Sequence, residues 1–392
     1  MRNFGYGLLF VQFFAKTYSI VKILLNFLLC LLVSHSILGL ATASQLPEEV
    51  IFVPKKLLIG SVSLETTIFK PDGDGPFPLV IINHGKANGN SHMQERYRPL
   101  SPVRYFLERG YVVFVPMRQG FSKSGGNYSD GACSMRANGF NQADDIQPVI
   151  DFAHSLEYVD KTKTLVVGQS HGGWTTLAYG ASSHEPSLKG LVNFAGGLKN
   201  ESCGGWRSDL YRTAAEFGKE TKIPTLWFYG DNDSYFSREV SDAMFENYKL
   251  GNPNSQFVAY GMFDADSHIL FTNRNGRAIW EPYLTKFLDS IGMPSKLINK
   301  QYQPPIQMPR PQKTNFAEFA EVEKIPGLTD AVKEAYKIFA SKPLPRAFAI
   351  SDSGNFGWEY GGEDPLAAAL NRCEKKAKAK CKLYAVDDFV VW

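Results

Sequence analysis

Two hydrophobic patterns alternate along the chain from Val50 to Ile291. Short apolar runs such as 79–82 (Leu-Val-Ile-Ile) and 112–115 (Val-Val-Phe-Val) are continuous, which is typical of strands covered on both faces. Longer stretches with apolar residues at helical spacing separate these runs. The alternation predicts an α/β fold, a mostly parallel, doubly wound sheet flanked by helices. The predicted strands are Thr66–Lys70, Leu79–Asn83, Tyr111–Pro116, Thr164–Gly168, Gly190–Phe194, Pro224–Tyr229 and Gln256–Tyr260.

Helix signals fall between these strands. Ser101 and Pro102 form a cap and a first-turn proline, and Gly110 ends the helix that they start. The following helix has an apolar stripe. The stripe consists of Ala143, Ile146, Val149, Ile150 and Ala153. Because ligands bind at the carboxyl ends of strands in such sheets, site residues are expected in the loops that follow the strands.

The pattern changes after Ile291. Residues 301–313 are rich in proline and glutamine and predict an extended linker, and a helix is expected over 328–340. The last 50 residues predict a small α+β unit. Its elements are a hairpin of 346–351 and 356–360, a helix over 365–376 and a strand over 382–392. The predicted divisions are a catalytic domain over 48–297, a linker and helix over 298–343, and the C-terminal unit over 344–392.

The amino terminus has the pattern of an export signal. Residues 1–43 contain Arg2, Lys16 and Lys22 but no acidic residue, and an apolar run leads to the small residues 41–43 (Ala-Thr-Ala). Such a segment predicts a secretory signal peptide cut after residue 43. The part before the apolar run is itself rich in Phe and Leu, so an uncleaved anchor that tethers the protein to a membrane is the alternative. The expected location is periplasmic or extracellular, or the outer side of an inner membrane.

Charge and composition agree with an exported globular protein. The chain of 392 residues has 42 Lys+Arg and 39 Asp+Glu, and 44% of it is hydrophobic, which is ordinary for a globular protein. Removal of residues 1–43 takes away three positive charges and leaves 39 of each sign. A neutral chain of this kind gives no support for nucleic-acid binding.

Four cysteines follow the export segment, and an even number in an exported chain suggests two disulfides. Closeness in sequence favours Cys373 with Cys381, which leaves Cys133 with Cys203. A continuous helix would hold Cys373 and Cys381 about 12 Å apart, beyond disulfide reach, so the helix is expected to end between them.

The clearest catalytic pattern is Gly168-Gln169-Ser170-His171-Gly172, between a predicted strand and a predicted helix. A serine on a tight turn between strand and helix needs small neighbours, which the two glycines provide. Its hydroxyl would project above the sheet, and the amino terminus of the helix would favour developing negative charge. Taken alone the pattern is weak, because glycine-rich turns are common, but its strand and helix strengthen it.

A serine nucleophile needs a base and an acid that orients the base. In this kind of sheet the chain order is Ser, then Asp or Glu, then His. Among the seven histidines only His268 lies far downstream of Ser170. The turn 230–234 (Gly-Asp-Asn-Asp-Ser) offers two acids, of which Asp233 is preferred and Asp231 is the reserve. Either could instead be an ordinary turn residue that binds its own backbone.

The tetrahedral intermediate of acyl transfer also needs hydrogen-bond donors for its oxyanion. The backbone N–H of His171 is one candidate, and the loop 84–86 (His-Gly-Lys) is expected to supply the second through the backbone N–H of Lys86. His84 is expected to brace this loop. The acidic segments 231–234 and 264–268 lack the central glycine and the final glutamate of a calcium loop, so no metal or other cofactor is expected.

Together these motifs resemble the α/β-hydrolase superfamily over Val50–Ile291. The segments 109–113 (Arg-Gly-Tyr-Val-Val) and 118–126 (Arg-Gln-Gly-Phe-Ser-Lys-Ser-Gly-Gly) look like the dienelactone hydrolase-like branch of that superfamily. Dienelactone hydrolases proper carry a cysteine where this chain has Ser170, so the resemblance implies a general esterase that acts on a small-molecule ester. The alternatives are a serine peptidase related to the prolyl oligopeptidases and an inactive scaffold that binds cell-envelope material.

Overall fold

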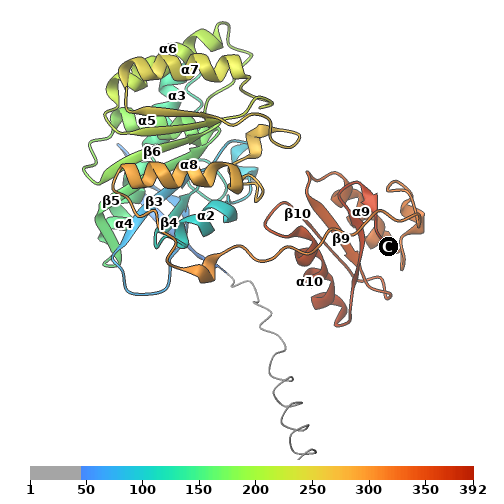
Figure 1. The fold of residues 1–392 in the computed structure, drawn as a ribbon. Coiled ribbons are helices and arrows are strands. Elements are labelled where there is room, and N and C mark those ends of the chain that lie inside the picture. The colour runs from blue at the N-terminus through green and yellow to red at the C-terminus, as the bar shows by residue number, and fades with distance from the viewer. Residues whose placement is uncertain (1–45) are drawn as a thin grey trace, which may run out of the picture. The chain divides into compact units, whose positions relative to one another are not determined.

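The structure is a computed structural model that describes residues 46–392. The signal or anchor expected over 1–43 lies outside these residues. The described chain forms a large sheet with helices on both faces and, after it in the sequence, a small antiparallel sheet with two helices (Figure 1). Within 46–392 no helix has the length and apolar character needed to cross a membrane.

The large sheet has eight strands in the order β1-β2-β4-β3-β5-β6-β7-β8. The pairs β1–β2 and β2–β4 are antiparallel, and every pair from β4 to β8 is parallel. The seven predicted strands are confirmed, and β1 was missed. The strands are β1 (Glu49–Lys56), β2 (Ser61–Phe69), β3 (Phe77–Asn83), β4 (Val112–Pro116), β5 (Val159–Gln169), β6 (Leu188–Phe194), β7 (Thr225–Tyr229) and β8 (Ser255–Ala259).

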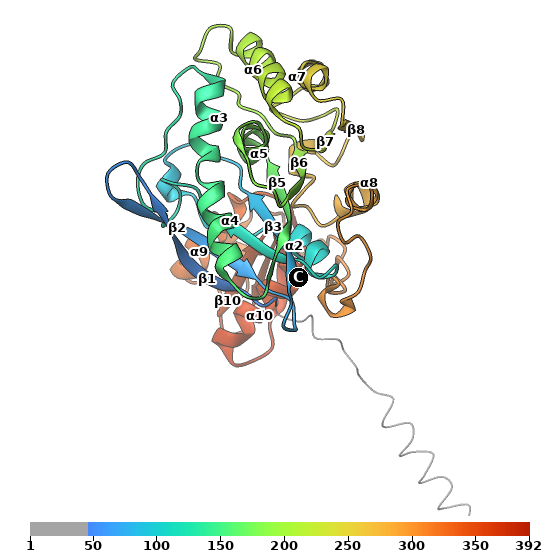
Figure 2. The same ribbon diagram turned by 90° about the vertical axis from the view of Figure 1, so that its left-hand side faces the viewer.

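The helices pack on the sheet in two layers (Figure 2). Helix α3 was not expected, and the stripe predicted from residue 143 begins a separate helix at Ile146. The helices are α2 (Leu100–Leu107), α3 (Met135–Ala143), α4 (Ile146–Ser155), α5 (His171–Ser182), α6 (Trp206–Glu220), α7 (Arg238–Gly251) and α8 (Arg277–Ser290). Short 3₁₀ turns lie at η1 (Ser91–Met93), η2 (Ser267–Ile269) and η3 (Lys300–Tyr302).

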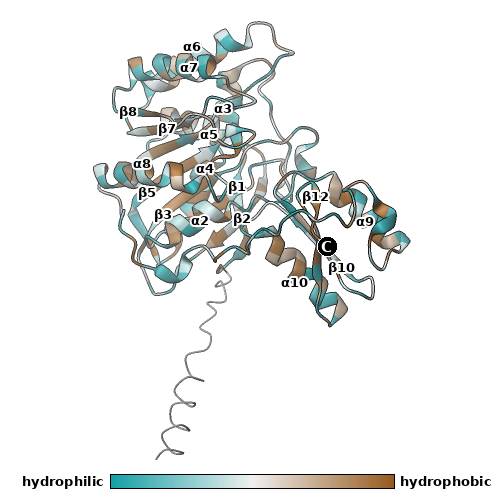
Figure 3. Ribbon diagram, turned by 45° about the vertical axis from the view of Figure 1, so that its right-hand side comes forward, coloured by the Kyte–Doolittle hydropathy of each residue, from teal (hydrophilic) through white to brown (hydrophobic). Residues whose placement is uncertain are grey.

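Alternate residues of the continuous apolar strands face opposite layers. Leu79 and Ile81 of β3 pack in the core under α3–α7, whereas Val80 and Ile82 pack in the core under α2 and α8. All four side chains are fully buried. Figure 3 shows hydrophobic positions concentrated along the strands of this sheet. Burial on both faces explains why the strands are apolar without alternation.

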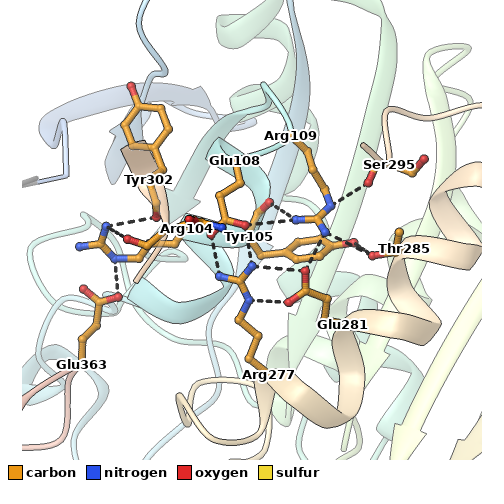
Figure 4. Close-up of polar contacts among 11 residues, drawn as sticks. Arg104, Tyr105, Glu108, Arg109, Arg277, Glu281, Thr285, Ser295, Tyr302 and Glu363 are labelled. Atoms are coloured by element: carbon orange, nitrogen blue, oxygen red, sulfur yellow. Dashed lines mark hydrogen bonds and ion pairs between the residues drawn. The ribbon is translucent and has the colours of Figure 1, made fainter. Parts of the chain in front are cut away.

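A cluster of ion pairs joins α2 to α8 (Figure 4). The carboxylate of Glu108 is fully buried and accepts two hydrogen bonds from Arg277, at 2.8 and 2.6 Å. Glu281 accepts from Arg277 at 2.7 Å and from Arg109 at 2.7 Å. Burial alone would raise the pKa of Glu281, but the hydrogen bonds and charges of these two arginines outweigh it and lower that pKa. The cluster therefore holds α8 against the end of α2.

The C-terminal sheet has the order β10-β9-β11-β12. The predicted hairpin and helix are confirmed, whereas the strand expected over 382–392 is interrupted at Asp387, a turn residue with φ of +51°. Helix α9, which the sequence placed before this unit, packs Val332, Tyr336 and Phe339 into the same core as Phe348 of the sheet. The elements are η4 (Val322–Lys324), α9 (Asp330–Ala340), β9 (Arg346–Ile350), β10 (Phe356–Tyr360), α10 (Pro365–Ala377), β11 (Lys382–Val386) and β12 (Phe389–Val390).

Two disulfides join the pairs favoured by the sequence, Cys133–Cys203 and Cys373–Cys381. Helix α10 ends at Ala377, between the cysteines of the second pair, and Lys378 follows it in the left-handed conformation. The Cα atoms of that pair are therefore 6.1 Å apart, within disulfide reach. Two disulfides are typical of a protein from an oxidising compartment.

Candidate active site

Ser170 occupies the turn between β5, which ends at Gln169, and α5, which begins at His171. Its φ of +56° and ψ of −125° are unfavourable for a residue with a side chain. A Cβ at Gly168 would collide with the backbone of Gly172, and one at Gly172 would collide with the carbonyl oxygens of Asn83 and His84. Glycine is therefore required at both positions, and the tight turn leaves the Ser170 side chain partly exposed at the carboxyl edge of the sheet.

The structure brings Asp233 and His268 together. Asp233 follows β7, and its side chain is fully buried, with the two carboxylate oxygens 3.1 and 3.0 Å from His268 Nδ1. Oδ1 also accepts the backbone N–H groups of Tyr235 and Phe236, which fix the carboxylate. A buried carboxylate on Nδ1 places the ring proton there and leaves Nε2 as the acceptor, the tautomer that a general base needs.

Asp231, the reserve acid, lies elsewhere. Its side chain is 46% exposed, and its carboxylate pairs with Arg238 at 3.2 Å. The structure therefore joins His268 to only one of the two aspartates of this turn.

Two further side chains hold the loop of His268, and the sequence did not single them out. Asp266 accepts the backbone N–H of His268 at 2.9 Å and the hydroxyl of Ser234 at 2.7 Å, so it ties the histidine loop to the loop of Asp233. Burial opposes the ionisation of Asp266, but these hydrogen bonds outweigh it and lower its pKa. Gln169 donates to the backbone oxygen of His268 at 2.8 Å, which anchors the same loop beside the serine turn. The position of Gln169 next to Ser170 was the one sequence signal that could have indicated a role for Gln169 in the site.

The expected oxyanion donors lie on both sides of Ser170. A Cβ at Gly85 would be 3.3 Å from Ser170 Cβ, so the loop 84–86 passes directly beside the serine. Among the contacts of residues 46–392, the backbone N–H of Lys86 donates to no protein atom. His171 begins α5, where the first N–H groups have no partner within the helix.

Ser170 and His268 are both at this edge of the sheet, but residues 46–392 show no hydrogen bond between Ser170 Oγ and the His268 ring. Such contacts often form only when substrate is bound. Within the same residues no group of three or more His, Cys, Asp or Glu side chains has the arrangement of a metal site.

Comparison with known proteins gives one family match. A model of the prolyl oligopeptidase family matches residues 99–290, just under half of the chain. No curated protein matches the sequence.

Several solved structures resemble about two thirds of the chain. An esterase from Pyrococcus furiosus is 17% identical with a TM-score of 0.46, over 62% of this chain and 91% of that one. A candidate dienelactone hydrolase from Klebsiella pneumoniae is 18% identical with a TM-score of 0.46, over 64% and 99%. A puromycin-hydrolysing peptidase from Mycobacterium tuberculosis is 18% identical with a TM-score of 0.48, over 64% and 40%.

The strand order and the serine turn between β5 and α5, together with the family match, define an α/β-hydrolase fold. The family model that matches is that of the prolyl oligopeptidases, which supports a hydrolase of the serine type.

Proposed function

We propose that the protein is an exported serine hydrolase that cleaves carboxylic esters through an acyl-enzyme on Ser170. The observation that carries the proposal is the pairing of the strained turn at Ser170 with the buried Asp233–His268 pair on the neighbouring loops. Asp233 orients His268, and His268 acts as the base that takes the proton of Ser170. The neutral charge of residues 44–392 sets no requirement on the charge of the ester.

The reaction proceeds in two halves. Ser170 Oγ attacks the ester carbonyl while His268 Nε2 accepts its proton, and the resulting oxyanion is held by the backbone N–H groups of His171 and Lys86. Collapse of this intermediate breaks the bond to the alcohol oxygen, which takes the proton from His268. Water then attacks the acyl-enzyme with His268 as base and releases the acid and free Ser170.

Export to the periplasm or the cell exterior is part of the proposal. Two disulfides and the pattern of residues 1–43 support it, and an uncleaved segment would tether the enzyme to a membrane. Comparison of the amino terminus of the mature protein with the sequence tests the cut after residue 43.

A fluorophosphonate probe tests the catalytic proposal. We expect the full chain to be labelled and Ser170→Ala to remain unlabelled, with unchanged thermal unfolding. An unlabelled wild-type protein would favour the inactive scaffold. Equal labelling of both proteins would show that a residue other than Ser170 is the nucleophile.

Turnover assays distinguish an esterase from a peptidase. The family match favours a serine peptidase as the second candidate. We expect hydrolysis of p-nitrophenyl esters across a chain-length panel. Turnover of peptide amides with no turnover of esters would replace the esterase by the peptidase while leaving the nucleophile in place.

A further inference from the structure

Arg118, two residues after β4, places a buried cation behind the serine turn. Its side chain is fully buried, and among the contacts of residues 46–392 no carboxylate pairs with it. Three neutral acceptors surround the guanidinium instead. They are the backbone oxygen of His84 at 2.7 Å, Nδ1 of His171 at 3.1 Å and Oε1 of Gln142 at 3.0 Å. The negative charge of Asp145 acts on Arg118 without a direct ion pair and offsets only part of the cost of burying the guanidinium.

The charge on Arg118 fixes the protonation of two histidines. Burial lowers the pKa of Arg118 to about 10, which leaves it a cation at neutral pH. Burial and this cation hold the pKa of both His84 and His171 well below the ordinary value. Both rings are therefore neutral, and each has one donor and one acceptor nitrogen.

The His84 ring connects Arg118 to the loop of Lys86. The backbone N–H of Arg118 donates to His84 Nε2 at 3.0 Å, so His84 carries its proton on Nδ1 and donates it to the carbonyl of Gly85 at 2.6 Å. Gln94 donates to the same carbonyl at 3.2 Å. In a trans peptide the C=O and the N–H point in opposite directions, so anchoring the carbonyl of Gly85 sets the direction of the N–H of Lys86.

The His171 ring connects Arg118 to the turn that carries Ser170. His171 Nδ1 accepts from Arg118, so Nε2 carries the proton and donates to Asn138 Oδ1 at 2.8 Å. The ring is held at both nitrogens, and the backbone N–H of His171 directly follows Ser170. One guanidinium thus contacts both of the segments that carry the expected oxyanion donors.

We infer that Arg118 is a positioning residue for the oxyanion site: it holds the backbone N–H groups of Lys86 and His171 in register, and its unpaired charge favours negative charge developing in front of them. The inference rests on the proposed function. Arg118 reaches the reacting atoms only through His84 and His171, so its loss should affect the transition state more than substrate binding.

The test compares Arg118→Met with Arg118→Lys and with a matched control, Arg109→Met. Arg109 is also a buried arginine, but it lies in the α2–α8 cluster rather than at the serine. Each variant is assayed for kcat and KM on p-nitrophenyl butyrate, for affinity toward a phenylboronic acid, whose serine adduct is a tetrahedral anion, and for thermal unfolding.

For Arg118→Met we expect kcat to fall about 10²-fold, the lower range for loss of one oxyanion donor, and boronate affinity to fall by a similar factor, with KM changed less than about threefold. Arg118→Lys should recover part of both losses because it restores the charge. Arg109→Met should change stability without changing kcat by more than about threefold.

Equal kcat and boronate affinity in wild type and Arg118→Met would overturn the inference, as would a loss confined to KM. If Arg118→Met does not fold, Gln94→Leu provides the test. This half-buried side chain donates to the carbonyl of Gly85 and accepts the backbone N–H of Ala87, so it holds the loop on both sides of Lys86. In Gln94→Leu, kcat and boronate affinity should fall together, about three- to tenfold. Unchanged values in Gln94→Leu would then refute the inference. Fluorophosphonate labelling of wild type distinguishes the two proposals. If wild type is not labelled, the proposed function fails. If wild type is labelled normally and the variants are unaffected, only the proposed role of Arg118 fails.

Discussion

The two aspartates of the turn after β7 lead to opposite predictions. Asp233→Asn keeps the size of the side chain, and its oxygen can still accept the N–H groups of Tyr235 and Phe236. The amide nitrogen would then face His268 Nδ1, 3.0 Å away, and would donate to it. His268 would carry its proton on Nε2, the nitrogen that must accept the proton of Ser170. The fold should survive, and the base should be in the wrong tautomer.

The expected loss is large because the wrong tautomer removes base catalysis almost completely. We expect kcat on a p-nitrophenyl ester to fall about 10⁴-fold, which corresponds to about 5.4 kcal/mol of transition-state stabilisation. Asp231→Asn removes only a surface ion pair with Arg238 and should change kcat less than about twofold. Thermal unfolding of each variant controls for folding.

The comparison can fail in two ways. A larger loss in Asp231→Asn than in Asp233→Asn would show that the pairing in the structure is not the catalytic one. Equal, small losses in both variants would show that His268 needs no orienting acid or is not the base. In either case the proposed roles of Asp233 and His268 would be withdrawn.

Much of the fold could be predicted because its signals are local. Strands β3, β4 and β7 are buried on both faces, so each is a nearly continuous apolar run that can be recognised without knowledge of its neighbours. Strand β1 contains a short apolar run at 50–53, but it lies at the edge of the sheet, and Pro54, Lys55 and Lys56 at its end weaken the strand pattern. The end of β11 was also missed. The turn there depends on a left-handed conformation at Asp387, and aspartate adopts that conformation too rarely for the sequence to predict it.

Some residues of the site could likewise be predicted from local sequence, and others could not. Gly168, Ser170 and Gly172 are contiguous, so the requirement for a tight turn is readable from the sequence. Asp231 and Asp233 lie in one turn, and only tertiary structure shows which of them meets His268. Arg118 was visible in the sequence as part of a motif, but its burial without a carboxylate partner depends on strands β3, β4 and β5 lying side by side.

Three further outcomes follow from the structure. Glu108→Ala should lower the free energy of unfolding in urea by about 1–3 kcal/mol, because Arg277 would lose two hydrogen bonds to a buried carboxylate and keep only Glu281, and a loss below about 1 kcal/mol would contradict that reason. Loss of the Cys133–Cys203 disulfide, which closes a separation of 70 residues, should cost about 4.4 kcal/mol, against about 2.5 kcal/mol for Cys373–Cys381 with a separation of 8. Urea unfolding of variants in which each pair is replaced by serine should give this order. Asp266 gives a prediction for acid stability. Its pKa is lowered in the folded protein from the ordinary 3.8, since its hydrogen bonds outweigh its burial, so its contribution to stability is complete above about pH 5 and is lost as the pH falls through and below 3.8. The stability difference between wild type and Asp266→Asn, measured by urea unfolding across this range, should therefore shrink as the pH falls. A difference that stays constant or grows would mean that the carboxylate does not hold the histidine loop through its charge.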